Sequence, residues 1–298
     1  MPAGTPGANG TSAVDCAALR SATYARSIVK RVQARSGAGD EVDIKQENIA
    51  YWNQRAKSYS LINQEQLQNG RGMAWLAAIE EPLTATFPER KRVTLRILDI
   101  GCGPGLFSIL LARRGYRAVA TDYTPNMLDE ARTNAQATGT ENLIEFVEAD
   151  AQNLPFADCS FDAIVSRNLT WDLPRPCDAY DEWHRVLVPG GIIVNFDANW
   201  YNYLFDDEAR HAYENDRLLT QESGMREECE IPGFERMEEI ARKMPLSPLD
   251  RPAWDEAYLR KLGMDVDVDA DIWQRVWNDE EKVNFASTPQ FRIVARKQ

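Results

Sequence analysis

The sequence predicts an α/β protein with a doubly wound, mostly parallel sheet of seven strands and helices on both faces. From residue 93 onward, apolar segments of strand length alternate with segments of helix length, a pattern typical of a parallel sheet. A glycine-rich turn, GCGPG, separates the first strand from the first helix. Acidic side chains stand at successive strand ends, at Asp99, Asp122 and Asp150. Together these observations predict a ligand site at the carboxyl edge of the sheet.

The segment before this core is predicted to be helical. Residues 1–42 begin with many Gly, Pro and small side chains, so we expect a flexible extension that includes a short helix at 13–35. Residues 43–68 have apolar side chains at three- and four-residue spacings, which predicts a long helix. A second helix is expected around 73–79, and Pro82 and Pro88 are expected to end the helical region, which we place at 43–90.

The core of the sheet is assigned to residues 91–199. Strands are expected at 93–100, 116–122, 143–150, 161–168 and 192–199, with helices at 106–114, 125–137 and 178–187 and a Pro-Gly-Gly turn at 189–191. Residues 200–254 interrupt this alternation with aromatic and then charged residues, which indicates a helical insertion after the fifth strand. Residues 255–298 are expected to complete the sheet, with strand signals within 259–268 and at 291–297.

Composition and charge limit the function classes. The chain has 298 residues, 44% of them hydrophobic, so it can bury a sizeable core. A net charge of −12 would repel a phosphate backbone, which disfavours nonspecific nucleic-acid binding. We expect a soluble, cytoplasmic protein, because no secretory signal and no apolar run of about 20 residues is present. The cysteines lack metal-ligand or redox spacing, so we expect reduced thiols and no metal; they are Cys16, Cys102, Cys159, Cys177 and Cys229.

The glycine turn predicts a nucleoside ligand. Glycine permits positive φ and close approach of a ligand to the backbone, and the helix that follows offers free N–H groups. A carboxylate at Asp122 can accept hydrogen bonds from both hydroxyls of a ribose. Leu106 stands where the dinucleotide pattern G-x-G-x-x-G requires its third glycine. This spacing disfavours the alternative of a nicotinamide-dependent oxidoreductase.

Several motifs occur in an order that resembles the class I S-adenosylmethionine-dependent methyltransferase family. They are ILDIGCGPG, VATDYTPNML, FVEADAQNLPF, FDAIVSRN and RVLVPGGIIV. The resemblance covers residues 93–199 well and the C-terminal strands loosely. The resemblance implies a Rossmann-like core, S-adenosylmethionine as cofactor and S-adenosylhomocysteine as product. The fourth motif lacks the D/N-P-P-Y/F pattern, which argues against enzymes that use it to methylate exocyclic amino groups of nucleic acids.

The resemblance also implies cofactor-binding positions. The turn residues would lie against the methionine part, Asp122 would hold the ribose, Tyr123 and Met127 would flank the adenine, and Asp150 and Ala151 would meet its amino edge. Asn168 would lie beside the sulfonium. Ordinary core packing for Tyr123 and Met127, and helix capping for Asp150, stay open as alternatives. The turn residues assigned to the cofactor are Asp99, Gly101, Cys102, Gly103 and Gly105.

The helix before the core resembles a lid of this family. YWNQRAKSYS contains the spacing W-x-x-x-A-x-x-Y, and a helix of this kind folds over the cofactor. Arg55 and Tyr59 would then reach the methionine carboxylate. The guanidinium of an arginine can donate two parallel hydrogen bonds to such a carboxylate. The alternative is a surface helix that packs through Trp52, Ala56 and Tyr59.

Methyl transfer requires little dedicated catalytic machinery, because the sulfonium is already a good leaving group and the protein mainly aligns the reactants. A base is needed only where the acceptor must lose a proton. Asp172 and Asp197 near strand ends, and His211 in the insertion, are the candidate bases. Residues 200–254 are expected to cap the acceptor. Four aromatic side chains are expected to form the walls of the acceptor site: Trp171, Trp200, Tyr201 and Tyr203. The alternative is that these side chains are simply buried under the insertion.

The leading hypothesis is a methyltransferase that acts on an apolar or cationic small molecule. A methyltransferase for RNA or protein, and a protein that binds S-adenosylmethionine without transferring its methyl group, are the alternatives. The formation of S-adenosylhomocysteine with each class of acceptor would distinguish them.

Overall fold

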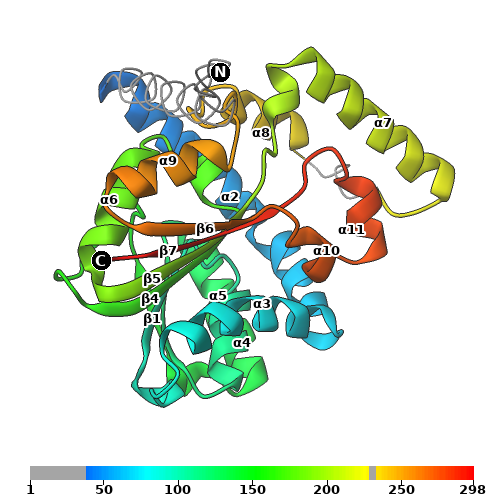
Figure 1. Ribbon diagram of the computed structural model, residues 1–298. Helices are drawn as coiled ribbons and strands as arrows, with labels where there is room; N and C mark the ends of the chain where they lie inside the picture. The colour runs from blue at the N-terminus through cyan, green and yellow to red at the C-terminus, as the bar shows by residue number, and fades with distance from the viewer. Residues whose placement is uncertain (1–37, 228–232) are drawn as a thin grey trace, which may run out of the picture.

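The computed structural model describes residues 38–227 and 233–298 (Figure 1). The predicted helix at 13–35, most of the predicted extension 1–42, and the thiols of Cys16 and Cys229 lie outside these residues. The other three cysteines are unpaired.

The sheet has seven strands in the order β3-β2-β1-β4-β5-β7-β6, and this confirms the predicted fold class. β1 to β5 pair in parallel, whereas β7 is antiparallel to both β5 and β6. The strand order reverses between β1 and β4, so a crevice opens at their carboxyl ends. The strands are β1 (Arg96–Ile100), β2 (Arg117–Asp122), β3 (Ile144–Glu148), β4 (Phe161–Arg167), β5 (Leu187–Asp197), β6 (Asp265–Asp269) and β7 (Phe291–Arg296).

Helices cover both faces of the sheet. In Figure 1, α3 and α4 lie below the strands, and α6 and α9 lie above them. The described helices are α2 (Ala38–Gln68), α3 (Arg71–Thr86), α4 (Leu106–Arg113), α5 (Pro125–Thr138), α6 (Pro176–Val186), α7 (Asp207–Ser223), α8 (Phe234–Ala241), α9 (Ala253–Lys261), α10 (Trp273–Val276) and α11 (Asp279–Asn284).

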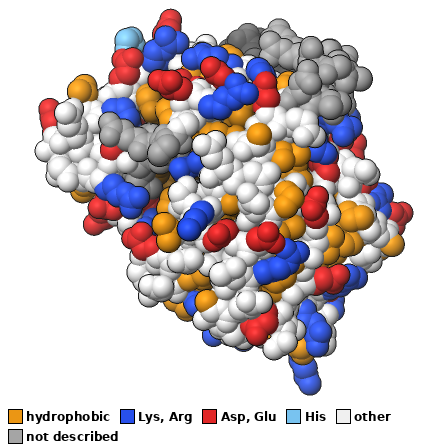
Figure 2. Space-filling view, turned by 180° about the vertical axis from the view of Figure 1, so that it is seen from behind, with side chains coloured by type: hydrophobic (Ala, Val, Ile, Leu, Met, Phe, Trp, Pro, Cys, Tyr) orange, Lys and Arg blue, Asp and Glu red, His pale blue; other side chains and the backbone are white. Residues whose placement is uncertain are grey.

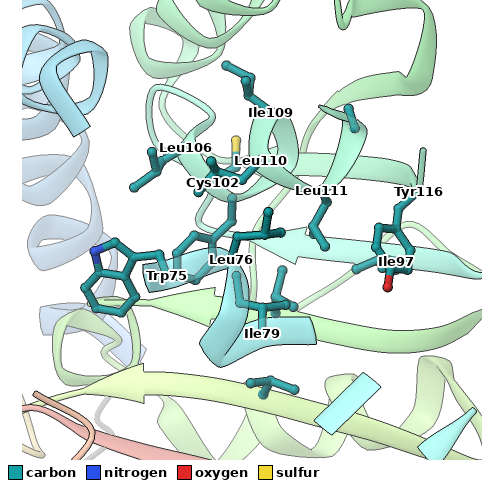
Figure 3. Close-up of a cluster of buried hydrophobic side chains, with 14 of the residues drawn as sticks. Trp75, Leu76, Ile79, Ile97, Cys102, Leu106, Ile109, Leu110, Leu111 and Tyr116 are labelled. Carbon is teal, nitrogen blue, oxygen red and sulfur yellow. The ribbon is translucent and has the colours of Figure 1, made fainter. Parts of the chain in front are cut away.

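Alternate residues of each central strand supply the two cores. In β4, Ala163 and Val165 join the core between the sheet and helices α3 and α4, while Ile164 joins the core between the sheet and helices α6 and α9. This follows from the two-residue repeat of a strand. Figure 3 shows the first core, which includes Trp75 of α3, Leu110 of α4 and Ile97 of β1. Since both faces are buried, the central strands carry apolar side chains on both sides, as Ile97 and Leu98 of β1 show.

Two predicted boundaries were wrong. Pro82 does not end its helix, because α3 continues through it to Thr86. Proline has no N–H to offer to Ala78 O, and Arg292 Nη1 donates to that oxygen instead at 2.9 Å. The sequence Pro-Gly-Gly is not a turn before the fifth strand but part of β5, where Gly190 has φ +78° and the pairing with β4 shifts register. The division of the chain into functional regions stays a prediction.

Candidate functional site

A cavity of about 280 Å³ opens at the carboxyl ends of β1, β2 and β4. α2 forms one wall, the segment after β5 with α7 and α8 forms another, and residues of α11 and the loop before β7 close the far end. The predicted site residues that line it are Arg55, Tyr59, Asp99, Gly101, Cys102, Gly103, Asp122, Tyr123, Met127, Asn168, Trp171, Asp172, Trp200, Tyr201 and Tyr203.

The glycine turn presents its backbone to this cavity. Gly101 and Gly103 have φ of +64° and +50°, values that an L side chain rarely adopts. The turn is tied to β2, because Cys102 N donates to Thr121 O at 2.9 Å. A Cβ atom added at Gly103 would lie 3.6 Å from the ring of Tyr59, so α2 lies directly over the turn.

Gly105 has a different position from the other two glycines. It does not line the cavity but precedes α4, with φ +88°. A Cβ atom there would come within 3.1 Å of Ala131 Cβ. The predicted contact of Gly105 with the cofactor therefore does not fit its place, where it allows α4 and α5 to approach each other.

Two buried carboxylates hold the turn in shape. Asp122 Oδ2 accepts from Gly103 N at 3.0 Å, and its Oδ1 accepts from Thr124 N at 2.9 Å. Asp99 Oδ2 accepts from both the N–H and the hydroxyl of Ser108 at the start of α4. Burial raises the pKa of Asp99 to about 6 and also raises the pKa of Asp122. Burial likewise raises the pKa of the Cys102 thiol well above its ordinary value, so this thiol stays protonated.

A smaller cavity lies beside the first and shares Gly101, Asp122 and Tyr123 with it. Asp150 and Ala151 line this cavity and not the larger one. Asp150 Oδ1 accepts from Gln152 N at 2.9 Å, and Lys45 Nζ of α2 lies 2.6 Å from its Oδ2. Burial acts to raise the pKa of Asp150, but the hydrogen bonds from Lys45 and Gln152 outweigh it, and the pKa is lowered. Asp150 thus both caps a turn and faces the site.

α2 combines packing with exposure to the cavity. Ala56 is buried, while Trp52, Arg55 and Tyr59 line the cavity. Arg55 is only 8% exposed, and its Nε has no hydrogen-bond partner among the described residues. A buried guanidinium N–H without a partner is costly. An acceptor such as a carboxylate beside it would remove that cost.

Of the three candidate bases, only Asp172 faces the cavity. It lies at the end of a 3-10 turn, Thr170–Asp172, and is 5% exposed. Its Oδ2 accepts from Trp52 Nε1 at 2.7 Å, whereas its Oδ1 has no partner within the described part of the chain. Burial raises the pKa of Asp172 to about 8. Hydrogen bonds from the side chains of Trp52 and Asn48 oppose this shift, and the charges of Asp197 and Asp122 add to it.

The predictions for Asp197 and His211 as bases were wrong in position. Asp197 is fully buried outside the cavity, paired with Arg251 at 2.9 Å. It accepts hydrogen bonds from Trp171 N and from Trp200 Nε1, so it holds two of the aromatic residues that line the cavity in place. The side chain of His211 is 81% exposed on α7, where its Nδ1 lies 3.6 Å from Glu214. Neither side chain can reach a ligand in the cavity.

The four predicted aromatic side chains line one wall of the cavity. The rings of Trp171 and Tyr201 have centroids 4.7 Å apart. Tyr203 stacks on Tyr213 of α7 at 4.0 Å, and its hydroxyl donates to Glu238 of α8. Packing in one apolar cluster and lining of the cavity therefore occur together.

Sequence reasoning missed the contributions of the C-terminal segment. Gln290 Nε2 donates to Asn168 Oδ1 at 2.7 Å, and Trp277 Nε1 donates to Gln290 Oε1 at 3.0 Å. These bonds fix Asn168, which has φ +56° at the end of β4. Asn63, Gln66 and other residues outside the motifs also line the cavity. The aromatic residues near 273–285 were the only feature of the sequence that could have indicated this contribution to the cavity. No regular spacing connects them to the motifs.

Comparison with known proteins identifies part of the chain. Residues 98–195 match the family described as methyltransferase domain. A demethylmenaquinone methyltransferase of Clavibacter sepedonicus is 41% identical over 99 residues, which cover 33% of this chain and 39% of the relative. A 24-methylenesterol C-methyltransferase 2 of Oryza sativa subsp. japonica is 30% identical over 147 residues, 49% of this chain and 39% of the relative. The chain thus spans well under two thirds of both relatives.

A solved structure agrees with the fold. A chain in a complex with the Trm112 methyltransferase activator of Haloferax volcanii superimposes with a TM-score of 0.53 at 19% identity. The match covers 82% of this chain and 96% of that one. Within the described ranges, no helix is both long and apolar enough to cross a membrane. The same residues include no group of His, Cys, Asp and Glu side chains that could hold a metal ion.

Proposed function

Because residues 98–195 form a methyltransferase domain of class I, the S-adenosylmethionine-dependent kind, we propose that the whole chain transfers a methyl group to a small-molecule acceptor. One observation carries this proposal. A single cavity contains the glycine turn and Asp122 at one side and an aromatic wall at the other. The first part suits a nucleoside ligand, and the second suits an apolar acceptor that faces it.

The residues of the cavity fit S-adenosylmethionine. When bound, this cofactor supplies a methyl group on a sulfonium, which is open to in-line attack. Asp122 would accept the ribose hydroxyls, and Gly101 and Gly103 would allow the methionine part to approach the backbone. Arg55, whose Nε lacks a partner in the described structure, would bind the carboxylate. Asp150 and Ala151 would meet the adenine in the smaller cavity.

Alignment is the main task of the remaining residues. Asn168, held by Gln290, would lie beside the reacting centre. Trp171 and Trp200, both held by Asp197, would position the acceptor and exclude water. A fixed arrangement of two reactants can by itself lower the barrier of a bimolecular reaction by about 7–11 kcal/mol.

A small, apolar acceptor is favoured over RNA or protein. Residues of α2 and of the segment with α7 and α8 line the cavity on either side of the glycine turn and the aromatic side chains, and such an enclosed, largely apolar lining is typical of small-molecule sites. On the face shown in Figure 2, basic and acidic side chains are interspersed, so that this face carries no broad basic surface. The two relatives are named for a quinone and a sterol acceptor, which are also small molecules.

Turnover tests this proposal against binding without transfer. The protein would be incubated with S-adenosylmethionine labelled at its methyl group, and with metabolite, RNA and protein fractions separately. We expect S-adenosylhomocysteine and label in the metabolite fraction, and less of both with the Asp122→Ala variant at the same concentration of S-adenosylmethionine. Label in RNA or protein alone would show that the acceptor is a macromolecule and not a small molecule. Binding of S-adenosylmethionine with no transfer in any fraction would refute the proposed methyltransferase activity.

A further inference from the structure

We propose that Asp172 accepts the proton of a hydroxyl group on the methyl acceptor, and that the acceptor is an apolar ring compound with a phenolic or enolic hydroxyl. This inference rests on the proposed function and extends it to a substrate class. Its basis is that Asp172 lines the cavity and that one of its two buried carboxylate oxygens, Oδ1, has no hydrogen-bond partner among the described residues.

The surroundings of Asp172 orient its carboxylate. Trp52 Nε1 holds Oδ2 at 2.7 Å, and Asn48 Nδ2 holds the backbone carbonyl of Asp172 at 3.2 Å. Both donors come from α2, so the lid helix fixes this residue from one side. Oδ1 keeps its hydrogen-bonding capacity, although the residue is only 5% exposed. A buried polar atom of this kind usually has a partner, and a ligand hydroxyl would supply it.

Asp172 lies where the lid meets the residues after β5. Trp171, Tyr51 and Trp52 belong to the same apolar cluster as Tyr203 and Met237, which follow β5 in the chain. An acceptor hydroxyl at Oδ1 would therefore place the ring of the acceptor against aromatic side chains. Aromatic rings pack favourably against such walls.

The electrostatics favour a neutral acceptor. No Lys or Arg among the described residues forms an ion pair with Asp172, and the charged groups that act on it are the carboxylates Asp122 and Asp197. The ionisable hydroxyls of Tyr51 and Tyr123 also face it. An anionic acceptor would be repelled by these carboxylates. An ammonium would compete with the positive sulfonium in a cavity of low dielectric constant.

The raised pKa of Asp172, about 8, suits the transfer of a hydroxyl proton. A phenol has an ordinary pKa of about 10, so the two groups are close enough to share a proton. In the step, the acceptor O–H bond breaks and the proton passes to Asp172 Oδ1. The electron pair left on the acceptor forms the new bond to the methyl carbon, and the S–CH₃ bond breaks with its electrons on sulfur.

The test compares two probes that differ in one hydrogen-bond donor, 2-naphthol and 2-methoxynaphthalene. Their affinities would be measured by calorimetry at pH 8.5 in the presence of S-adenosylhomocysteine. We expect 2-naphthol to bind the wild type about tenfold more tightly, the usual worth of a hydrogen bond to a charged group. Asp172→Asn should abolish this ratio and leave the affinity for S-adenosylhomocysteine within about twofold.

Asp150→Asn is the matched control, because it changes the same chemical group in the smaller cavity. It should weaken S-adenosylhomocysteine and leave the ratio of the two naphthalenes unchanged. Trp52→Phe gives a second route if Asp172→Asn fails to fold. It removes a hydrogen bond that lowers the pKa of Asp172, so the preference for 2-naphthol should appear at a higher pH than in the wild type.

Equal binding of the two probes, no binding of either, or a ratio retained in Asp172→Asn would overturn the inference. Loss of S-adenosylhomocysteine binding in Asp172→Asn, with its fold intact by thermal melting, would also overturn it by assigning Asp172 to the cofactor. Failure of the wild type itself to bind S-adenosylhomocysteine would instead refute the proposed function. The two failures are therefore distinguishable.

Discussion

Asp172 shows how one buried side chain links stability to chemistry. The residue is 5% exposed, its carboxylate accepts a hydrogen bond from Trp52, and it lies near two other carboxylates, Asp197 and Asp122. The folded protein therefore holds the proton of Asp172 more tightly than the unfolded chain does. Ionisation of this buried carboxyl group therefore lowers the stability of the fold. Proteins tolerate such a loss of stability at functional sites, and a proton acceptor in an apolar cavity would be one.

Stability should therefore depend on the ionisation of Asp172. Its pKa is about 8 in the folded protein against an ordinary value of 3.8, so the contribution to the free energy of unfolding is present below pH 3.8 and is lost as pH rises towards 8. Between these limits the wild type should lose up to about 1.4 kcal/mol per pH unit relative to Asp172→Asn. Urea unfolding at about pH 5.5, 7.0 and 8.5 measures this difference. Parallel stability curves for the two proteins would contradict the raised pKa.

Asp122 tests the other end of the cavity. Asp122→Ala should weaken S-adenosylhomocysteine by about 1–3 kcal/mol, the cost of losing a charge-assisted hydrogen-bond acceptor. Asp129→Ala, at an exposed position of α5, is the control and should bind normally. An unchanged affinity in a folded Asp122→Ala variant, measured by calorimetry, would remove Asp122 from the ribose role.

Among the elements, α3 shows how a distant residue corrects a local defect. Pro82 leaves the carbonyl of Ala78 without its helical donor, and Arg292 of β7 supplies one at 2.9 Å. The same guanidinium pairs with Glu81 of α3 and lies near Asp269 of β6. One side chain therefore joins α3 to the edge of the sheet.

A double-mutant cycle tests this role. Arg292→Met should lower the free energy of unfolding by about 1–3 kcal/mol, since it leaves a buried carbonyl without a donor. The same replacement in a Pro82→Ala background should cost less, because the introduced alanine has a backbone N–H that can donate to Ala78 O. Urea unfolding of the four proteins gives the coupling. An equal cost in both backgrounds would show that Arg292 acts only through Glu81 and Asp269.

The elements nearest the motifs could be predicted from the sequence, because their signals are local. The glycine turn, the end of β2 at Asp122 and the helix from Trp52 to Tyr59 follow from local patterns, whereas β3 ends at Glu148, two residues before the predicted end at Asp150. Pro82 was misread because the donor that replaces its N–H is 210 residues away in β7 (292 − 82). Gln290 and Trp277 were missed for the same reason, since tertiary contacts alone bring them to Asn168.

On the scale of the whole molecule, a buried charge network joins the sheet to the insertion. Arg251 pairs with Asp197 at the end of β5 and with Asp255 in α9, and all three side chains are almost completely buried. Asp197 also fixes Trp171 and Trp200. Asp197 was assigned to catalysis because a strand-end carboxylate appears in the sequence, whereas its partner Arg251 carries no local signal. The network thus shapes the cavity from outside.

Removal of Arg251 should destabilise the whole fold. Arg251→Met leaves two buried carboxylates without a counter-charge, which typically costs about 3–5 kcal/mol. Arg242→Met, which breaks a surface pair with Glu238 at 3.9 Å, should cost less than about 1 kcal/mol. Chemical unfolding compares the two. Similar small losses in both variants would show that the buried network contributes little.

The most direct test of the account is a calorimetric titration of the wild-type protein with S-adenosylhomocysteine, and with NAD in parallel. The glycine turn G-x-G-x-G, the carboxylate of Asp122 and the free Nε of Arg55 predict binding of S-adenosylhomocysteine in the micromolar range and no binding of NAD. Binding of NAD without binding of S-adenosylhomocysteine would contradict the assignment of the cavity.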